Sequence, residues 1–321
     1  MSNKPDLTII VPLYDEDESL SPLMEWVAQV VKKAGLSYEV LMVDDGSKDG
    51  SWKVINELKQ QYGDVLRAFR YRRNYGKSAA LHTGFQNARG EVVITMDADM
   101  QDSPDEIPDL YSLVKKHGFD MVSGWKKKRY DPISKTIPSK FYNWVARKAT
   151  GIKLHDFNCG LKAYRNKVVK SIEVYGEMHR YIPVLVKQAG FYKIGEKVVQ
   201  HRKRQFGKTK FGFERFINGF LDLMSVLFIT RFGKRPMHLF GVMGTVVFIL
   251  GFASALYLGI RKIVAVSHGV ILERVTQNPY FYIALTCMVI GVVLFLAGFL
   301  AELISRTGSD RNDYQIDEII E

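Results

Sequence analysis

The 321-residue chain has few cysteines and no internal repeat or low-complexity tract. Its two cysteines, Cys159 and Cys287, lie far apart and lack the spacing of metal ligands. This argues against a disulfide framework and a zinc site, and we expect free thiols in a reducing compartment. No secretory signal is visible, because the first apolar run, LTIIVPLY, is short and carries a proline. We expect that run to form a first strand.

Acidic residues are outnumbered, with 34 Asp and Glu against 45 Lys and Arg, a net charge of +11. Such a balance suggests an anionic partner, either nucleic acid or a membrane surface. Charge is missing altogether from residues 237–260 and 275–301. About twenty apolar residues in a helix cross a hydrocarbon core about 30 Å thick. The alternative is a helix buried in a soluble core, but uncharged runs of this length favour two membrane spans, and hence a membrane rather than a nucleic acid.

Basic residues are distributed unevenly around these two runs. The flank before the first run, residues 202–235, is rich in Arg and Lys, whereas the loop between the runs holds Arg261, Lys262 and Arg274 with Glu273. The more basic flank faces the cytoplasm in membrane proteins. We therefore expect residues 1–235 and both termini to be cytoplasmic, and the loop near Ser267 to be outside.

The first 125 residues alternate between strand-like runs and helical patterns. The first helix is predicted over residues 21–35, with Ser21 as N-cap, Pro22 at the first helical position and Gly35 after its end. This alternation predicts an α/β domain with a mostly parallel sheet, whose ligands bind beyond the carboxyl ends of the strands. The strands are expected at 7–14, 38–47, 65–71, 91–99 and 119–124, and the further helices at 50–63, 76–90 and 104–118.

Apolar residues recur at helical spacing over residues 213–235, with charges between them. This pattern indicates an amphipathic helix in the membrane interface, or alternatively a helix packed on the soluble domain. The expected organisation is a soluble domain over 1–212, a juxtamembrane helix over 213–235, two spans over 236–305 with a loop at 261–275, and a polar tail over 306–321.

Carboxylates cluster where the fourth predicted strand ends, at Asp97, Asp99 and Asp102. Like charges this close repel, and burying them is costly unless a cation is bound. Oxygen ligands suit Mg²⁺ or Mn²⁺, and Mg²⁺ commonly completes its shell with substrate phosphates. The expected ligand is therefore a diphosphate, although surface loops also produce Asp-x-Asp sequences.

Two other predicted strands also end in acidic residues. The first is followed by residues 15–18, DEDE, and the second by Asp44 and Asp45 with Gly46. Three neighbouring strand ends would then present carboxylates to one edge. An acidic side chain there can accept hydrogen bonds from a nucleobase imide or a ribose hydroxyl.

Five motifs occur in an order typical of a known family: TIIVPLYDEDESL, VDDGSKDGS, RNYGKSAAL, MDADMQDSP and FNCGLKAYR. The chain resembles the family 2 inverting glycosyltransferases, and with its two C-terminal spans it resembles more narrowly the polyisoprenyl-phosphate glycosyltransferases. That group includes dolichol-phosphate mannose synthase and the bactoprenol glucosyl transferases. The resemblance covers essentially the whole chain. It implies the GT-A fold, a nucleotide-sugar donor and metal-assisted transfer onto a lipid phosphate.

The resemblance also implies roles for individual positions on the donor side. Asp97 and Asp99 would hold ribose and metal with help from Gln101, and Asp99 would be catalytic. Glu16 is equally a solvated loop charge and Lys77 an ordinary surface lysine, although Lys77 lies at a helix start, where anions bind. The expected nucleotide-sugar contacts are Pro12, Tyr14, Glu16, Asp44, Asp45, Lys77 and Asp97, with Arg204 and Lys208 from a segment that closes over the diphosphate.

For the acceptor, the resemblance implies a lipid phosphate held by Lys126 and Arg129. Family members often have arginine at position 126, which puts two-pronged phosphate binding by Lys126 in doubt. Asp156 would face the acceptor as a base or an orienting residue, or would simply cap a helix. A lipid phosphate is already anionic and needs little help from a base.

The sequence thus predicts an inverting, metal-dependent transferase in a bacterial inner membrane, moving a sugar from a nucleotide to undecaprenyl or another polyprenyl phosphate for cell-envelope glycosylation. Glucose from UDP-glucose is the first expectation, and N-acetylhexosamine, mannose and aminoarabinose remain open. The alternatives are a saccharide or other lipid acceptor, and a non-catalytic nucleotide-binding module. A homo-oligomer, such as a tetramer, is a further expectation from related enzymes.

Overall fold

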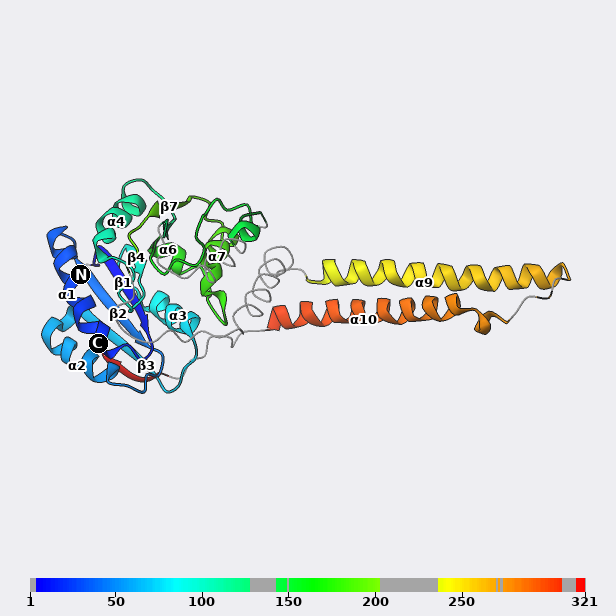
Figure 1. Ribbon diagram of the computed structural model, residues 1–321, viewed down its shortest axis with the longest axis horizontal. Helices are drawn as coiled ribbons and strands as arrows, with labels where there is room; N and C mark the ends of the chain where they lie inside the picture. Colours follow the sequence, from blue (N-terminus) through cyan, green and yellow to red (C-terminus); the bar gives the residue numbers. More distant parts are fainter. Residues whose placement is uncertain are drawn as a thin grey trace. The chain divides into compact units, whose positions relative to one another are not determined.

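The computed structural model describes residues 4–127, 143–148, 150–202, 236–269, 271, 274–307 and 316–320. The chain forms two compact units (Figure 1). One consists of Met1–Leu227 with Arg311–Glu321, and the other is Phe228–Asp310. Each unit is described by itself.

The first unit is built on one mixed sheet with the order β7-β5-β6-β4-β1-β2-β3-β8. β1 pairs in parallel with β2 and β4, β2 with β3, and β5 with β7, whereas β6 and β8 run antiparallel to their neighbours. The predicted mostly parallel α/β sheet is confirmed. The strands are Leu7–Leu13, Tyr38–Asp44, Leu66–Tyr71, Val92–Thr95, Met121–Trp125, Lys162–Arg165, Ile194–Val198 and Ile316–Ile320, numbered β1 to β8 in this order.

Helices cover the sheet because its central strands are apolar on both faces. Every residue of β1 is buried, and leucine, isoleucine and valine side chains of α1 and α2 pack into the same core. The helices are α1 (Asp17–Lys33), α2 (Ser51–Tyr62), α3 (Lys77–Asn87), α4 (Ile107–Lys115), α6 (Asn166–Val169) and α7 (Ile182–Gln188), with short 3₁₀ turns at Gly63–Val65, Pro104–Glu106 and Met178–Tyr181.

The predicted start of α1 was wrong. The helix begins at Asp17, four residues before Ser21, and Pro22 lies inside it. Asp17 and Glu18 occupy its first turn, where negative charge interacts favourably with the helix dipole. The helix therefore starts at the acidic cluster and tolerates the proline near its beginning.

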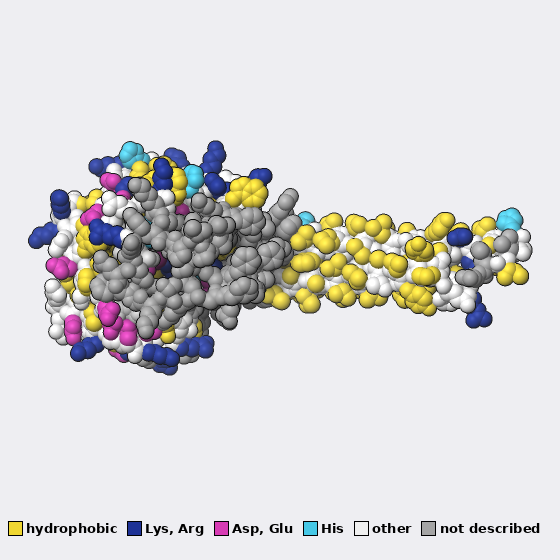
Figure 2. Space-filling model, in the orientation of Figure 1, with side chains coloured by type: hydrophobic (Ala, Val, Ile, Leu, Met, Phe, Trp, Pro, Cys, Tyr) yellow, Lys and Arg dark blue, Asp and Glu magenta, His cyan; other side chains and the backbone are white. Residues whose placement is uncertain are grey.

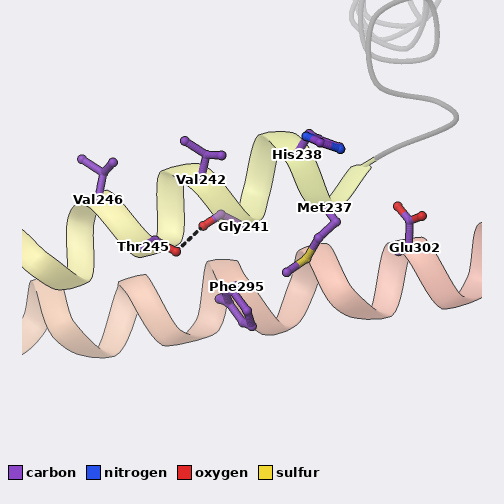
Figure 3. A pocket seen from close by; sticks show the side chains of 8 residues that line it. All are labelled: Met237, His238, Gly241, Val242, Thr245, Val246, Phe295 and Glu302. Atoms are coloured by element: carbon purple, nitrogen blue, oxygen red, sulfur yellow. Dashed lines mark hydrogen bonds between the residues drawn. The ribbon is translucent and has the colours of Figure 1, made fainter.

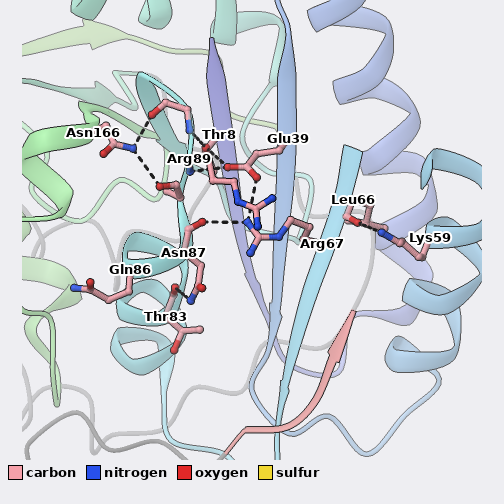
Figure 4. A network of polar contacts seen from close by, with 12 residues as sticks. Thr8, Glu39, Lys59, Leu66, Arg67, Thr83, Gln86, Asn87, Arg89 and Asn166 are labelled. Carbon is pink, nitrogen blue, oxygen red and sulfur yellow. Dashed lines mark hydrogen bonds and ion pairs between the residues drawn. The ribbon is translucent and has the colours of Figure 1, made fainter. Parts of the chain in front are cut away.

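The amino-terminal end of the sheet is closed by a buried polar network (Figure 4). Arg67 on β3 and Glu39 on β2 form an ion pair of 3.3 Å with both side chains almost fully buried. Glu39 also accepts hydrogen bonds from the Thr8 hydroxyl at 2.6 Å and the Arg89 backbone N–H at 2.7 Å. Arg67 donates to the carbonyl of Asn87 at 3.2 Å. The network ties three strands to the segment after α3, and the buried Arg67 and Glu39 side chains neutralise each other.

The last residues of the expected polar tail form strand β8, antiparallel to β3. The Trp52 indole N–H donates to Glu318 at 2.7 Å, and Arg70 pairs with the same carboxylate at 3.3 Å. Ile320 packs against the main core. The chain beyond the second apolar helix therefore returns to the α/β unit.

The second unit is a pair of long helices, α9 (Pro236–Ser267) and α10 (Pro279–Thr307), with a 3₁₀ turn at Val275–Gln277. Both are long and apolar enough to cross a membrane, and apolar side chains cover their surface (Figure 2). A Cβ added at Gly244 would lie 2.5 Å from the Gly291 carbonyl oxygen, and one at Gly251 would lie 2.6 Å from that of Ala284. Small residues thus allow the two backbones to approach closely, as is common between membrane helices.

Figure 3 shows this helix pair near the start of α9. Met237 extends toward α10, whereas Val242 and Val246 point away from it and are largely exposed. The Thr245 hydroxyl donates to the Gly241 carbonyl at 2.8 Å, which satisfies a polar group within its own helix. The apolar outer surface of the pair suits a hydrocarbon environment.

Candidate active site

A pocket of about 400 Å³ opens beyond the carboxyl ends of β1, β2 and β4. This is the edge at which a mostly parallel sheet binds its ligands. Seven of the predicted donor-site residues lie here together: Pro12, Tyr14, Glu16, Asp45, Lys77, Asp97 and Asp99. Sequence reasoning had not singled out Leu13, Asn74, Gly76, Ala80 and Ala98, which complete the lining.

Asp45 fixes the loop that precedes α3. Its carboxylate accepts hydrogen bonds from the backbone N–H groups of Tyr75 at 2.7 Å and Gly76 at 2.8 Å. Gly76 has a φ of +93°, a conformation that side chains rarely allow. Burial nevertheless raises the pKa of Asp45 to about 6. The loop held in this way places Lys77 at the first turn of α3, facing the pocket.

Lys77 and Asp97 form an ion pair of 2.5 Å at the centre of the site. Burial alone would raise the pKa of Asp97, but the charges of Lys77 and Lys126 outweigh it and lower the pKa to about 2. Gly160 packs against this carboxylate, since a Cβ there would lie 2.4 Å from an Asp97 oxygen. Asp97 is therefore a permanent negative charge held in place by a lysine and a glycine.

Asp99 differs from Asp97 although only one residue separates them. Burial and the charge of Asp97 raise the pKa of Asp99 to about 6. Among the described residues, no group of three or more His, Cys, Asp or Glu side chains is placed to hold a metal ion. The donor set fits an ion that takes one or two carboxylates from the protein and its remaining ligands from phosphates and water, as Mg²⁺ commonly does.

Two non-glycine residues next to lining residues of the pocket have positive φ angles, Asp15 at 54° and Met100 at 55°. Both follow the ends of strands that line the pocket, and such conformations are costly unless surrounding contacts enforce them. Asp15 is held by two contacts across to the loop after β2: its N–H donates to Ser47, and its carboxylate accepts from the Lys48 N–H at 2.8 Å. The loop after β1 is thus held in place by contacts to the loop after β2.

Asp44 lies behind the pocket rather than in its lining. Its side chain is fully buried, accepts the Ser47 N–H at 2.8 Å and lies 3.6 Å from the Arg70 guanidinium. Gln101 follows Asp99, but its side chain is not part of the lining, while its backbone N–H donates to Asp99 at 3.2 Å. Direct ligand contact by these two residues stays a prediction.

The acceptor-side residues are placed as follows. Lys126 pairs with the fully buried Asp102 at 2.7 Å, and the lysine side chain is itself mostly buried. Asp156 is buried and accepts the Asn158 N–H at 3.1 Å. Arg129, Arg204, Lys208 and the predicted juxtamembrane helix over 213–235 lie outside the described residues. The role of the acceptor residues stays a prediction.

A second cavity, of about 340 Å³, lies on the other side of the Lys77–Asp97 pair, since both residues line it as well. Lys162, His179 and Arg180 contribute to its lining, and sequence reasoning missed all three. Lys162 lies in the motif FNCGLKAYR, directly after Asp156, but no role was expected for it. His179 and Arg180 are far from β4 in the sequence, and only the fold brings them to the cavity beside this strand.

The order of strands and the acidic carboxyl edge are those of the GT-A fold class. The sequence profile described as glycosyl transferase family 2 matches residues 8–173. The chain belongs to this family, as its motifs predicted.

Curated relatives match nearly the whole chain. Dodecaprenyl-phosphate galacturonate synthase of Rhizobium johnstonii is 35% identical over 306 residues, covering 94% of this chain and 88% of that protein. Undecaprenyl-phosphate 4-deoxy-4-formamido-L-arabinose transferase of Pectobacterium atrosepticum is 33% identical, covering 95% and 90%. The predicted resemblance to polyprenyl-phosphate glycosyltransferases is confirmed.

Solved structures share the fold. Glucosyl-3-phosphoglycerate synthase of Mycobacterium tuberculosis, in complex with UDP, has a TM-score of 0.54 at 15% identity, covering 70% of this chain and 80% of that one. The same enzyme with Mn²⁺, UDP-glucose and phosphoglyceric acid gives a TM-score of 0.53. At this identity the likeness establishes the fold alone.

Proposed function

We propose that this chain transfers a sugar from a nucleotide-sugar, with UDP as the nucleotide, to the phosphate of a polyprenyl lipid, inverting the anomeric carbon. The single observation that carries the proposal is the pocket at the carboxyl edge, where Asp45, Lys77, Asp97 and Asp99 converge beside the ends of β1 and β4. The names of the polyprenyl-phosphate relatives support the acceptor class.

In this proposal the nucleotide lies along the loop after β1, and the diphosphate lies near Lys77 and the first turn of α3. Cationic and N–H donors at a helix start stabilise an anion, and most strongly the charge that develops on a leaving group. Lys77 is held by Asp97, so its ammonium is positioned before the donor arrives. This chain then binds and orients the donor while the acceptor attacks from the opposite face.

A divalent cation, Mg²⁺ or Mn²⁺, would be held by Asp99 with Asp97 nearby, and it would offset charge on the departing diphosphate. The raised pKa of Asp99 supports this assignment, since an uncompensated carboxylate is poorly stabilised there. Solved glucosyl-3-phosphoglycerate synthase structures contain Mn²⁺.

The acceptor needs no strong base, because a lipid phosphate is anionic at neutral pH. Asp156 is buried with its carboxylate bonded to a backbone N–H, which suits an orienting role better than proton abstraction. Lys126 and Arg129 remain the proposed phosphate-binding cations. Lys126 is already paired with Asp102, so we assign it a smaller share of phosphate binding than Arg129.

We further propose that the helix pair spans the bacterial inner membrane, with the α/β unit in the cytoplasm. Residues on both sides of the helix pair belong to the α/β unit, β1 to β7 before it and β8 after it. Because one folded sheet cannot be divided by a bilayer, both ends of the pair belong on the same side. A homo-oligomer stays a prediction.

The sugar is the open part of the proposal. The names of the relatives specify galacturonate and 4-deoxy-4-formamido-L-arabinose, whereas glucose, the first expectation from the sequence, stays a prediction. The test is incubation of the purified full-length protein with a panel of UDP-sugars, Mn²⁺ and undecaprenyl phosphate, with UDP release measured. Release that needs the lipid phosphate supports the proposal. Release with a saccharide acceptor alone, or binding of the donor without any release, contradicts it.

A further inference from the structure

The second cavity has a polar, positively charged lining. Thr95, Asn158, Cys159, Gly160 and Tyr164 form part of its wall, and Lys77, Lys162 and Arg180 bring three cationic side chains to it. Asp97 is the one carboxylate among its described lining residues, and it already forms an ion pair with Lys77. The described lining therefore carries an excess of positive charge.

Lys162 is the most unusual of these cations, because only 4% of it is exposed. Within the described part of the chain, its ammonium donates one hydrogen bond, to the carbonyl of Cys159, and forms no ion pair. Lysine is almost never buried without a counter-charge. Burial and the charge of Lys77 lower the pKa of Lys162, although the charges of Asp156 and Asp97 act in the opposite direction. Among the described residues no carboxylate forms an ion pair with this buried ammonium.

Two further groups of the lining, Arg180 and His179, do not supply the missing negative charge, and Arg180 itself pairs with the exposed Glu177 carboxylate at 3.9 Å. His179 accepts or donates a hydrogen bond at 3.1 Å with the Ser78 hydroxyl, and it lines the cavity next to Arg180. Burial, together with the charges of Lys77, Arg180 and Lys162, lowers the pKa of His179 to about 3. The imidazole is therefore neutral at physiological pH and supplies no counter-charge to the Lys162 ammonium.

The cavity adjoins the donor pocket through shared walls, since Lys77 and Asp97 line both. A sugar attached to a diphosphate near Lys77 would therefore reach this cavity. We propose that the cavity receives the sugar of the donor and that Lys162 and Arg180 bind a carboxylate on that sugar, which makes a nucleotide-linked hexuronic acid the preferred donor. The inference rests on the proposed function and names its substrate class.

A carboxylate fits these residues better than the alternatives do. A neutral hexose would leave the Lys162 ammonium without an anionic partner, whereas the C6 carboxylate of a hexuronic acid would pair with it. The guanidinium fork of Arg180 suits a planar carboxylate. The phosphate of a polyprenyl lipid would bring its apolar chain with it. Only two of the described lining residues, Leu81 and Ile182, are aliphatic, which suits such a chain poorly.

The experiment compares two donors that differ only at this position, UDP-glucuronate and UDP-glucose, and likewise UDP-galacturonate and UDP-galactose. Binding to the full-length protein with Mn²⁺ is measured by calorimetry, and kcat/KM with undecaprenyl phosphate is measured by UDP release. We expect at least one acid donor to exceed its neutral partner by about 100-fold in kcat/KM, because a site built around a polar partner rejects the analogue that lacks it.

Arg180→Gln should reduce that preference by about tenfold or more, since the side chain is 28% exposed and its loss should leave the fold intact. The matched control is Arg89→Gln, which removes the same charge from an exposed position at the other end of the sheet and should leave the preference unchanged. Thermal unfolding of both variants shows that they fold.

The outcomes separate this inference from the proposed function. Equal binding and turnover of acid and neutral donors overturns the inference and leaves the proposed function standing. A variant that raises the KM for undecaprenyl phosphate without changing the donor preference also overturns it, and assigns the cavity to the acceptor phosphate. If no donor is turned over, the proposed function fails, and the calorimetric comparison of each donor pair still decides whether the cavity prefers a carboxylate.

Discussion

The two ends of the central sheet bury charge in opposite ways. At the amino-terminal end, Arg67 and Glu39 are 3.3 Å apart, and their remaining bonds go to Thr8, Arg89 and Asn87 (Figure 4). At the carboxyl end, like charges are crowded together: Asp97 and Asp99 lie one residue apart, and Lys162 is buried without an acidic partner among the described residues. The charges at the amino-terminal end pair with each other, whereas those at the carboxyl end are paired only in part, as Lys77 is with Asp97.

This contrast separates residues that stabilise the fold from residues that we expect to bind ligands. Removing one member of a satisfied buried pair leaves an unpaired charge and destabilises the protein. Removing one member of a cluster of like charges reduces the repulsion in the folded protein and weakens ligand binding. The following changes test that distinction.

The largest effect is expected from Asp99→Asn. Loss of the proposed cation ligand should lower kcat by at least about 10³-fold, since electrostatic stabilisation of a leaving group is a major term in such reactions. The free protein should stay folded. UDP release and thermal unfolding check both parts, and Asp64→Asn, an exposed aspartate, is the control. A variant with near-normal turnover would exclude Asp99 from the site.

Arg67→Met should have the opposite signature. It leaves the Glu39 carboxylate buried and unpaired, which should cost about 3–5 kcal/mol of unfolding free energy. Turnover per folded molecule should change little, because the network lies at the end of the sheet away from the pocket. Chemical denaturation gives the stability, and a loss of less than about 1 kcal/mol would show that the pair is not needed.

The pH dependence of stability should also distinguish the carboxyl end of the sheet from the amino-terminal end. The pKa of Asp99 is raised from 3.8 to about 6, so the folded chain holds this proton more tightly than the unfolded chain. Its stabilising contribution is present below pH 3.8 and is lost as the pH rises through about 6. In EDTA, Asp99→Asn should therefore match the wild type in melting temperature near pH 4 and exceed it near pH 7. Equal melting temperatures at both pH values would contradict the raised pKa.

The smallest effect is expected from Glu318→Gln on β8. The carboxylate pairs with Arg70 and accepts the Trp52 N–H, but it is half exposed, so the loss should be about 1 kcal/mol or less. Glu57→Gln, which breaks an exposed pair with Lys53 on α2, is the matched control. Denaturation of the two variants compares them, and a loss of several kcal/mol would instead make β8 a principal support of the sheet.

Short motifs allowed the sequence to place several acidic residues at one edge of the sheet. Glu16, Asp45, Asp97 and Asp99 each lie at or just after the end of a predicted parallel strand, and all four line the pocket, while their roles in ligand binding stay predictions. The two apolar runs likewise appear as α9 and α10. The start of α1 was misplaced because Ser21–Pro22 is a good helix start on its own, and the acidic cluster before it was assigned only to the ligand.

What the sequence determined by itself was the alternation of elements, the apolar helices and the acidic carboxyl edge, since each depends on residues close together in the chain. Only the tertiary structure joined Glu39 to Arg67, returned residues 316–320 to the sheet, and brought Lys162 and Arg180 to one cavity beside Asp97. These contacts link distant segments, and the free energy that decides them comes from burial and charge pairing in the folded chain, which no local pattern records.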